Sequence, residues 1–310
     1  MTDIGHAVAL MHRRNRRVWL AKRRHVLGAT DAVAVLGFSK WATPLDVWLT
    51  KTGRYTDDSI GDKYAVKRGN ALEPLLIAEW VQQNPGAVLL AHPPLLAHPQ
   101  HPMIAASLDG AAQLDGEQVV LEAKTAAWRA REDWWDETRM IPDQYAAQVL
   151  LQLAVTGLDT AHVVADIAGD FRTLIVERDR DFEAWALPAL ADWWQAHVVA
   201  DVPPDPDPVR DYPSLSRVWV PSPGLGIEAD GRMLADIDAY RQASSTAKHH
   251  KAIADEMRGR IRIAMREATA VTHGGERVVS VSKSGALTVK QSATGAPASI
   301  PAADLSSPSL

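Results

Sequence analysis

Two carboxylates and a lysine lie close together in the stretch SLDGAAQLDGEQVVLEAKT, which runs from residue 107 to 125. A turn rich in Gly and Asp separates two apolar segments, so the pattern predicts a β-hairpin. Successive side chains alternate between the faces of a strand, and Glu122 and Lys124 therefore share one face. Hairpin pairing is expected to bring Asp109 beside Glu122.

This combination of groups favours a metal site that acts on phosphates. Neighbouring carboxylates repel each other unless a cation lies between them. Mg²⁺ accepts oxygen ligands from one or two carboxylates and from phosphates, and the backbone carbonyl of Ala123 offers another oxygen. Lys124 is placed to hold an attacking water or to balance phosphate charge. The alternative is a surface hairpin with an ordinary Glu–Lys pair, because short patterns of this kind are common.

Size and composition indicate one large α/β core with an appendage, since the chain has 310 residues and is 46% hydrophobic. No apolar run predicts a membrane span, and no signal peptide is expected. The absence of cysteine excludes disulfides, thiolate zinc sites and iron–sulfur clusters. A cytoplasmic location is the natural expectation. The net charge of −5 does not indicate a nucleic-acid partner, but basic side chains cluster near the N-terminus: Arg13, Arg14, Arg16, Arg17, Lys22, Arg23 and Arg24.

The segment after this cluster contains a candidate phosphate site. A basic helix is predicted over residues 12–24, followed by a short helix over 31–36 that Thr30 caps and Gly37 ends. Such a helix start attracts anions, and Arg23 can add a bidentate contact. The alternative is a plain capped helix with a solvated arginine.

Further elements follow from apolar spacing and turn residues. Glu73 borders the apolar stripe of its predicted helix and either reaches water or points into a site. Three glutamines, Gln144, Gln148 and Gln152, repeat at i, i+4, so they form either an inward amide stripe that needs partners or a solvated face. The predicted helices cover residues 45–50, 69–83, 142–156 and 181–200, a loop covers 55–67, and the predicted strands cover 88–91, 103–108, 161–167 and 171–177.

Histidines and tryptophans offer weaker candidates. The spacing of His92, His98 and His101 among prolines is typical of turns and matches no metal-ligand pattern. Aromatic side chains after the hairpin either stack on bases or pack against the core: Trp128, Trp134 and Trp135.

A proline-rich break at residues 201–213 predicts the end of the core, which gives a first domain over 1–213. A helical extension is predicted over 214–291. It contains a long helix near 229–270 that either packs on itself or binds a partner, and a terminal hairpin. Residues 292–310 have the composition of a disordered tail.

Four blocks of the chain, in order, resemble the YqaJ-like viral recombinase family, which includes phage lambda exonuclease and belongs to the PD-(D/E)XK nucleases. They are RRHVLGATDAVAVLGFSKWATPLDVWLTKTG, RGNALEP, ASLDG with LEAKT, and IPDQYAAQVLLQLAVTG, and together they cover roughly residues 16–200. The resemblance implies a restriction-endonuclease-like core, in which helices flank a central mixed β-sheet, with a C-terminal helical extension and a short hairpin.

The resemblance also implies a role for each matching residue. Asp109, Glu122 and the Ala123 carbonyl would hold metal, and Lys124 would be the catalytic lysine. Glu73 would be an extra acidic group near a second metal, and Gln148 would be a helix glutamine beside the metals. Arg23 and Thr30 would form a 5′-phosphate pocket, with Arg24 and Arg17 as further DNA contacts.

The implied activity is a 5′–3′ exonuclease that degrades one strand of linear duplex DNA and leaves 3′ tails for strand annealing. Two Mg²⁺ ions, with Mn²⁺ as a substitute, a ring-shaped homo-oligomer and a phage-type single-strand annealing protein belong to this picture. Two alternatives stay open: an endonuclease of restriction or repair type, which needs no 5′-phosphate pocket, and a non-catalytic DNA-binding or assembly module on the same fold.

Overall fold

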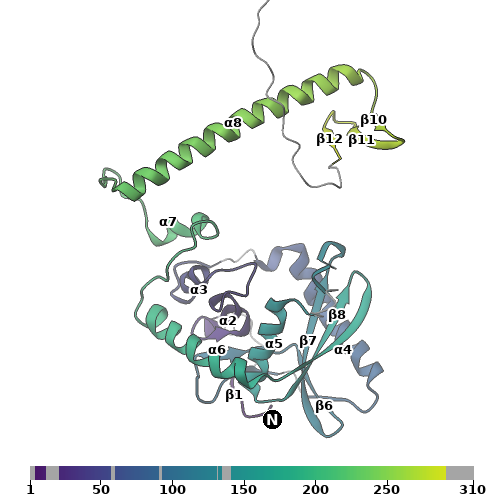
Figure 1. Ribbon diagram of the computed structural model, residues 1–310. Helices are drawn as coiled ribbons and strands as arrows, with labels where there is room; N and C mark the ends of the chain where they lie inside the picture. The colour runs from purple at the N-terminus through teal and green to yellow at the C-terminus, as the bar shows by residue number, and fades with distance from the viewer. Residues whose placement is uncertain are drawn as a thin grey trace, which may run out of the picture. The chain divides into compact units, whose positions relative to one another are not determined.

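The computed structural model describes residues 4–11, 21–56, 60–90, 93–130, 132–134 and 141–290 (Figure 1). The chain divides into two compact units, Met1–Pro223 and Gly224–Leu310, and each is described by itself. Most of the predicted basic helix, with Arg17, lies outside the described residues, as do His92, Trp135 and the tail from residue 292.

A five-stranded mixed sheet forms the centre of the first unit. The strand order is β3-β6-β7-β8-β9, with β7 and β8 parallel and all other pairs antiparallel. The strand ranges are β3 Val88–Leu89, β6 Gly110–Leu114, β7 Glu117–Ala126, β8 Thr160–Ile167 and β9 Asp170–Glu177. The predicted mixed α/β sheet architecture is therefore confirmed.

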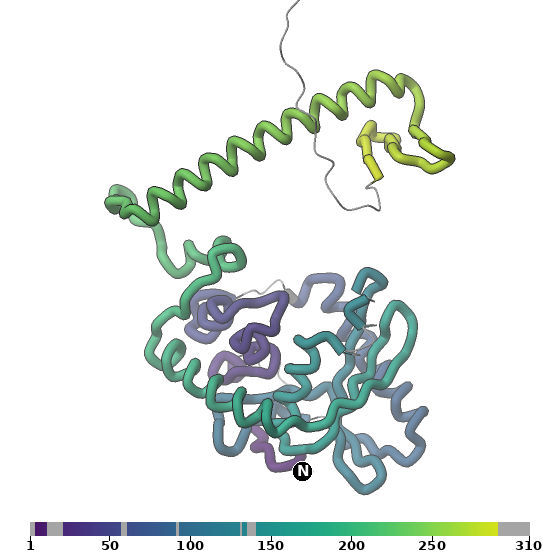
Figure 2. Tube along the Cα trace, viewed as in Figure 1, coloured from purple at the N-terminus to yellow at the C-terminus, as the bar shows by residue number. Residues whose placement is uncertain are grey.

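A second, four-stranded sheet with the order β1-β4-β5-β2 lies in the same unit. Its strands are β1 Val8–Met11, β2 Leu27–Gly28, β4 Leu95–Ala97 and β5 Ile104–Ala106. Only β5 was predicted, because the other three are short and lack clear alternation. The first described residues also reach a distant helix, since the His6 amide donates to the Thr156 carbonyl at 2.8 Å. Figure 2 shows the purple N-terminal trace against teal segments of the core.

Helices cover both faces of the central sheet. Leu76 and Trp80 of α4 (Tyr64–Gln83) pack on Leu121 and Val164 on one face. On the other face, α5 (Asp143–Thr156) packs with α2 (Ala29–Val35) and α6 (Arg180–Trp193) around Val120 and Val163. The alternation along β7 thus turns Leu121 toward α4 and its neighbour Glu122 toward α5.

Two predicted helix starts are wrong. Helix α2 begins at Ala29 rather than Asp31, because the Asp31 carboxylate accepts the Gly28 amide at 2.9 Å and starts the turn earlier. Thr30 is therefore inside the helix and does not cap it. Helix α4 begins at Tyr64, so the loop that was expected to reach Lys67 ends earlier. An ion pair of Arg68 with Asp166 at 3.0 Å holds the start of the helix to β8.

The remaining elements of the first unit are short, apart from α3 (Pro44–Lys51), which Thr43 caps. A π-helical turn, Trp194–Val199, continues α6. A contact within the proline-rich break holds the chain to the start of α3, since Thr43 donates to Asp211 at 2.5 Å. The other segments are η1 Ile60–Asp62, η2 Trp128–Ala130, η3 Glu132–Trp134, η5 Tyr212–Ser214 and α7 Leu215–Val218.

The second unit contains one long helix and a small antiparallel sheet. Helix α8 spans Gly231–Met265, and the strands are β10 Ala270–His273, β11 Glu276–Val281 and β12 Leu287–Val289. The predicted hairpin corresponds to β11 and β12, and β10 adds a third strand. Among the described residues, no helix is long and apolar enough to cross a membrane.

Candidate active site

The hairpin of β6 and β7 brings the predicted carboxylates together. Gly110 pairs with Leu121, so the neighbouring Asp109 lies across from Glu122. The Asp109 Oδ2 atom accepts a hydrogen bond from the Ala123 amide at 3.0 Å, which fixes this carboxylate at the end of the strand pair.

Glu122 lies at the centre of a polar network although its residue is only 2% exposed. Its Oε1 atom accepts from Lys124 Nζ at 2.5 Å and from Gln148 Nε2 at 2.6 Å. Its Oε2 atom accepts from Gln152 Nε2 at 2.7 Å. The glutamines of α5 therefore form the inward amide stripe, and the alternative of a solvated face is wrong.

Burial and charge set the protonation of this cluster. Burial, reinforced by the charges of Glu122 and Glu73, raises the pKa of Asp109 well above its usual value. Burial alone would lower the pKa of Lys124, but the charges of Glu122 and Asp109 outweigh it and raise that pKa. Lys124 therefore stays an ammonium group, and its charge offsets only part of the repulsion that raises the pKa of Asp109.

Glu73 reaches this site from the opposite side of the sheet. It lies on α4 and is close enough for its charge to raise the Asp109 pKa. The approach of Glu73 to a metal stays a prediction.

A cavity of about 130 Å³ opens beside the carboxylates and also contains the predicted phosphate-binding residues. A Cβ atom at Gly28 would lie 3.2 Å from Arg23 Nη2, so the guanidinium lies directly against the backbone of the α2 start. The cavity is lined by Arg23, Gly28, Ala29, Thr30, Ser107, Asp109, Glu122 and Gln148. Arg24 is not among these residues and donates to Thr56 at 2.9 Å.

A buried ion pair supports the Arg23 side of the cavity. Lys51 donates to Asp31 Oδ2 at 2.6 Å and to the Arg23 carbonyl at 2.9 Å. Burial acts against both charges. It is outweighed at Asp31, whose pKa is lowered by Lys51 and Arg23, but it dominates at Lys51, whose pKa is lowered.

Sequence reasoning missed Ser107, Asp31 and Lys51 at this site. Ser107 lines the cavity, and its buried hydroxyl has no hydrogen-bond partner in the described structure. Its position two residues before Asp109 was the available sign. The pairing of Asp31 with Lys51 joins two helices and has no sign in the sequence.

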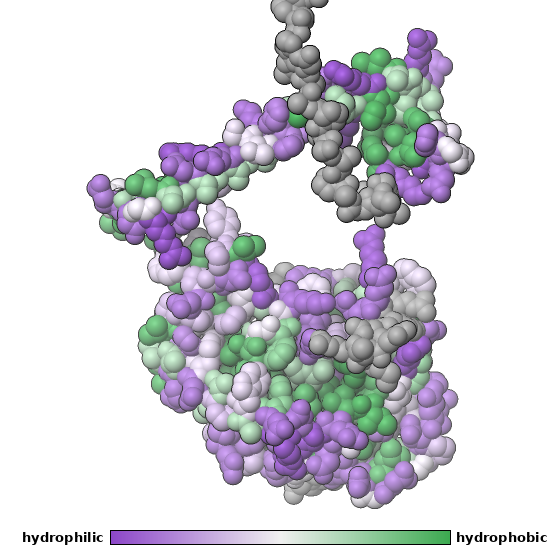
Figure 3. Space-filling view, in the orientation of Figure 1, coloured by the Kyte–Doolittle hydropathy of each residue, from purple (hydrophilic) through white to green (hydrophobic). Residues whose placement is uncertain are grey.

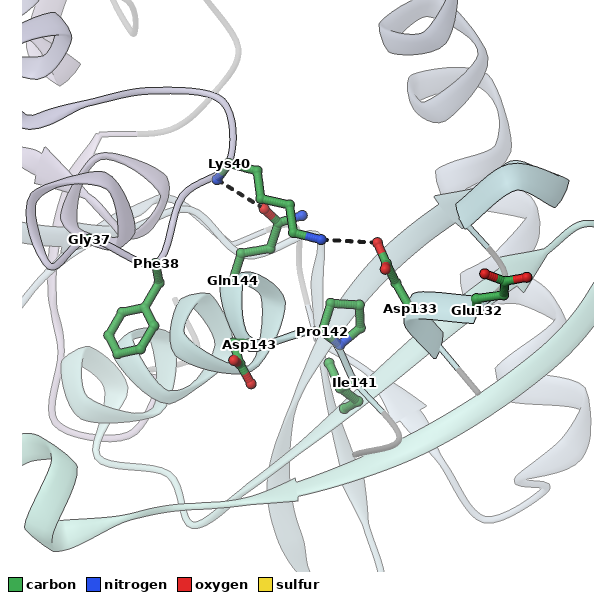
Figure 4. Close-up of a pocket in the computed structure, with 9 residues that line it drawn as sticks. All are labelled: Gly37, Phe38, Lys40, Glu132, Asp133, Ile141, Pro142, Asp143 and Gln144. Carbon is green, nitrogen blue, oxygen red and sulfur yellow. Dashed lines mark hydrogen bonds and ion pairs between the residues drawn. The ribbon is translucent and has the colours of Figure 1, made fainter. Parts of the chain in front are cut away.

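A larger cavity, of about 370 Å³, lies at the start of α5 (Figure 4). Lys40 crosses it, donating from Nζ to Asp133 at 3.1 Å and from its amide to Gln144 Oε1 at 3.4 Å. Gln144 precedes Gln148 by one helical turn, so both cavities lie along the same face of α5. The larger cavity has the acidic residues Glu132, Asp133 and Asp143 along its wall, but Asp109 and Glu122 line the smaller one, and we therefore assign the chemistry to the smaller cavity.

Aromatic side chains extend the network. The Lys124 ammonium lies 5.0 Å from the centre of the Tyr145 ring, and Tyr145 packs against Trp134 at 5.3 Å between ring centres. Trp134 is buried in the core, whereas Trp128 is exposed. Base stacking thus has only Trp128 as a candidate among the tryptophans described in this segment.

His98 lies among the prolines of residues 93–102 and has the position in a turn that the sequence predicted. His98 is buried and accepts through Nδ1 from the amides of Gln100 and His101 at 3.2 and 3.1 Å. Such a pattern holds a turn together.

The residues present suit a hard cation that also binds a phosphate. Within the described ranges, no group of three or more His, Asp or Glu side chains could hold a metal ion by itself. Asp109 and Glu122 supply two carboxylates, and their repulsion favours a bound cation. Mg²⁺ typically takes one or two carboxylates and completes its shell with waters and substrate phosphates. Asp109 and Glu122 therefore fit a Mg²⁺ site that a substrate phosphate completes.

Comparison with known proteins identifies the first unit. A family model described as YqaJ-like viral recombinase domain matches residues 18–159. This part of the chain is therefore similar to a YqaJ-like viral recombinase domain. The uncharacterized protein YqaJ of Bacillus subtilis is 31% identical over 193 residues, which are 61% of this chain. The match covers 59% of that relative's length.

Solved structures with the same fold include an alkaline exonuclease from Laribacter hongkongensis. Its crystal structure matches with a TM-score of 0.50 and 19% identity, over 60% of this chain and 94% of that one. The same enzyme in complex with dAMP matches with a TM-score of 0.51 over 65% of this chain and 97% of that one, also at 19% identity. At this identity the likeness establishes a shared fold, and it confirms the expected core, in which helices flank a central mixed β-sheet.

Proposed function

We propose that the protein is a Mg²⁺-dependent exonuclease that degrades one strand of linear duplex DNA from its 5′ end. One observation carries the proposal: Arg23 and Thr30 line the same small cavity as Asp109, Glu122 and Gln148. Groups suited to binding a terminal phosphate and carboxylates suited to hydrolysis thus line one cavity. An endonuclease has no need of this arrangement.

In this proposal Asp109, Glu122 and the Ala123 carbonyl would hold the metal, with Glu73 nearby. The bound Mg²⁺ would supply charge stabilisation for the phosphoryl group and lower the pKa of water. Lys124 and Gln148 hold the attacking water, because both already donate to Glu122 within the same network. Mn²⁺ is expected to replace Mg²⁺.

The reaction breaks the P–O3′ bond of the first internucleotide linkage. Water adds to phosphorus, the released O3′ takes a proton, and the products are a 5′-mononucleotide and a strand with a new 5′-phosphate. Arg23 and Thr30 can then bind the new phosphate, so the enzyme meets the same substrate after each cycle. The larger cavity along α5 gives the following nucleotides room on the same face of the protein.

The test is digestion of a linear duplex with a 5′-phosphate at one end and a 5′-hydroxyl at the other, with a closed circle as the control substrate. We expect Mg²⁺-dependent release of mononucleotides from the phosphorylated strand, an intact circle, and no activity for Lys124→Ala. Cutting of the circle would establish the endonuclease instead. DNA binding without any cutting would support the non-catalytic module. The ring assembly and the annealing partner stay predictions.

A further inference from the structure

A buried lysine lies next to the small cavity, in contact with Arg23. Figure 3 shows hydrophilic side chains, in purple, spread over the visible face of the first unit, which is where charged groups normally lie. Lys51, the last residue of α3, is an exception, since its side chain is only 3% exposed. Replacing a buried ion pair by apolar side chains often leaves a protein equally stable or more stable, so the burial of this charge calls for a reason other than stability.

Three charged groups meet at the start of α2. A Cβ atom at Gly28 would lie 3.2 Å from both Arg23 Nη2 and Asp31 Oδ2, so a guanidinium and a carboxylate converge on the same stretch of backbone. Lys51 Nζ donates to the same Oδ2 atom of Asp31 at 2.6 Å and to the backbone carbonyl of Arg23 at 2.9 Å. The ammonium group therefore contacts both the acidic and the basic residue of this cluster.

The charges of the cluster indicate what Lys51 does there. Burial acts against the charge of Asp31, but Lys51 and Arg23 outweigh it and lower the pKa of this group, so Asp31 is a carboxylate. A carboxylate beside Arg23 offsets the guanidinium and repels an incoming phosphate. Lys51 neutralises that carboxylate, and two positive groups with one negative group leave one net positive charge beside the cavity.

We propose that Lys51 determines the selectivity of the cavity for a 5′-phosphate, although it is not one of the described residues that line the cavity. It acts through Asp31: it neutralises this carboxylate, so that the charge of Arg23 acts on the terminal phosphate. The inference rests on the 5′-phosphate pocket of the proposed function. It goes further, because it names the residue that gives the pocket its net charge.

Binding of DNA ends to the full-length chain tests the proposal without hydrolysis. A fluorescent DNA hairpin with one open end carries either a 5′-phosphate or a 5′-hydroxyl there, and EDTA removes the metal. The readout is the phosphate preference, which is the dissociation constant of the hydroxyl end divided by that of the phosphate end. Lys51→Met keeps a long side chain without its charge and should lower this preference about tenfold. Asp31→Asn removes the opposing charge and keeps an acceptor for the Gly28 amide, so the preference should stay at least as high as in the natural chain.

The two variants separate an electrostatic role from a structural one, because each leaves a buried charge without its partner. Glu183→Gln, at the buried ion pair of Glu183 with Arg178, is the matched control and should cost stability without changing the preference. A lower preference in both the Lys51 and the Asp31 variants would make the pair a structural support. An unchanged preference in Lys51→Met would show that its charge does not reach the phosphate, and either result overturns the proposal. If the natural chain bound both ends equally, the 5′-phosphate pocket of the proposed function would be wrong as well.

Discussion

Gln148 donates from Nε2 to the Oε1 atom of Glu122 at 2.6 Å, and this bond connects helix α5 to strand β7. The other end of the same amide, Oε1, accepts from Lys124 Nζ at 3.1 Å. Both the nitrogen and the oxygen of the amide are therefore hydrogen-bonded, and the side chain aligns the Lys124 ammonium with the Glu122 carboxylate. In the proposed nuclease, a residue that orients Lys124 and Glu122 should affect turnover more than binding.

Gln148→Ala is expected to lower kcat on linear duplex DNA by about 10- to 100-fold, the range seen when an outer partner of a metal ligand is lost. DNA affinity should change little, because binding relies on other groups. Gln144→Ala is the matched control, one helical turn earlier and without contact to Glu122. Equal loss in both variants would assign the effect to the helix rather than to the Gln148 amide.

Arg23→Gln should abolish the preference for a 5′-phosphate. A hydrogen bond to a charged group is worth about 1.5–3 kcal/mol, so the rate ratio of phosphorylated to hydroxyl ends should fall roughly 10- to 100-fold. The measurement compares initial rates on the two ends. Arg24→Gln is the control, since Arg24 binds Thr56 and does not line the cavity. A ratio that falls in the Arg24 variant but not in the Arg23 variant would exchange their roles.

Asp31→Ala should destabilise the first unit by about 3–5 kcal/mol, because it leaves the buried ammonium of Lys51 without its carboxylate. The Lys51 side chain is only 3% exposed. Urea unfolding would measure the loss. The double variant Asp31→Ala/Lys51→Met removes the orphaned charge and should recover much of the stability. A double variant no more stable than Asp31→Ala would mean that the charge is not the cause.

His98 should make the first unit less stable in acid. Burial, together with the nearby His101 and His6, lowers the pKa of His98 to about 4. The unfolded chain binds this proton near pH 6.5 and the folded chain only near 4, so the free energy of unfolding falls as pH drops from 6.5 toward 4. His98→Asn keeps an acceptor for the turn amides but does not titrate. Urea midpoints at pH 7 and pH 5 should differ less for this variant than for the natural chain.

Much of the site was predictable because its signs are local. Alternation along β7 and the turn before it determine that Asp109, Glu122 and Lys124 meet, and the i, i+4 spacing determines that the glutamines share a face. The start of α2 was mispredicted, since Gly28 is the N-cap and the Asp31 carboxylate accepts its amide, which starts the helix two residues earlier. The pairing of Asp31 with Lys51 was not predictable, because it depends on how α2 packs on α3.

The short strands were not predicted, for a related reason. Strands β2 and β4 have two and three residues, too few for a period to appear, and their neighbours in the sheet determine their extended form. By contrast, β7 has ten residues and its alternation is plain. The predicted domain boundaries stay predictions, although contacts such as that of Thr43 with Asp211 tie the proline-rich segment to the first unit.

The parallel pairing of β7 with β8 has a consequence for how the protein is made. The chain must complete the crossover through α5 before Gln148 and Gln152 can reach Glu122, and Arg23 is more than a hundred residues away from them in sequence. Chains emerge from the ribosome N-terminal end first, so Arg23 and the carboxylates emerge before the two glutamines. Premature termination or a protease cut before α5 would therefore release fragments with an incomplete site, and whatever chemistry the site performs begins only when the first unit is whole.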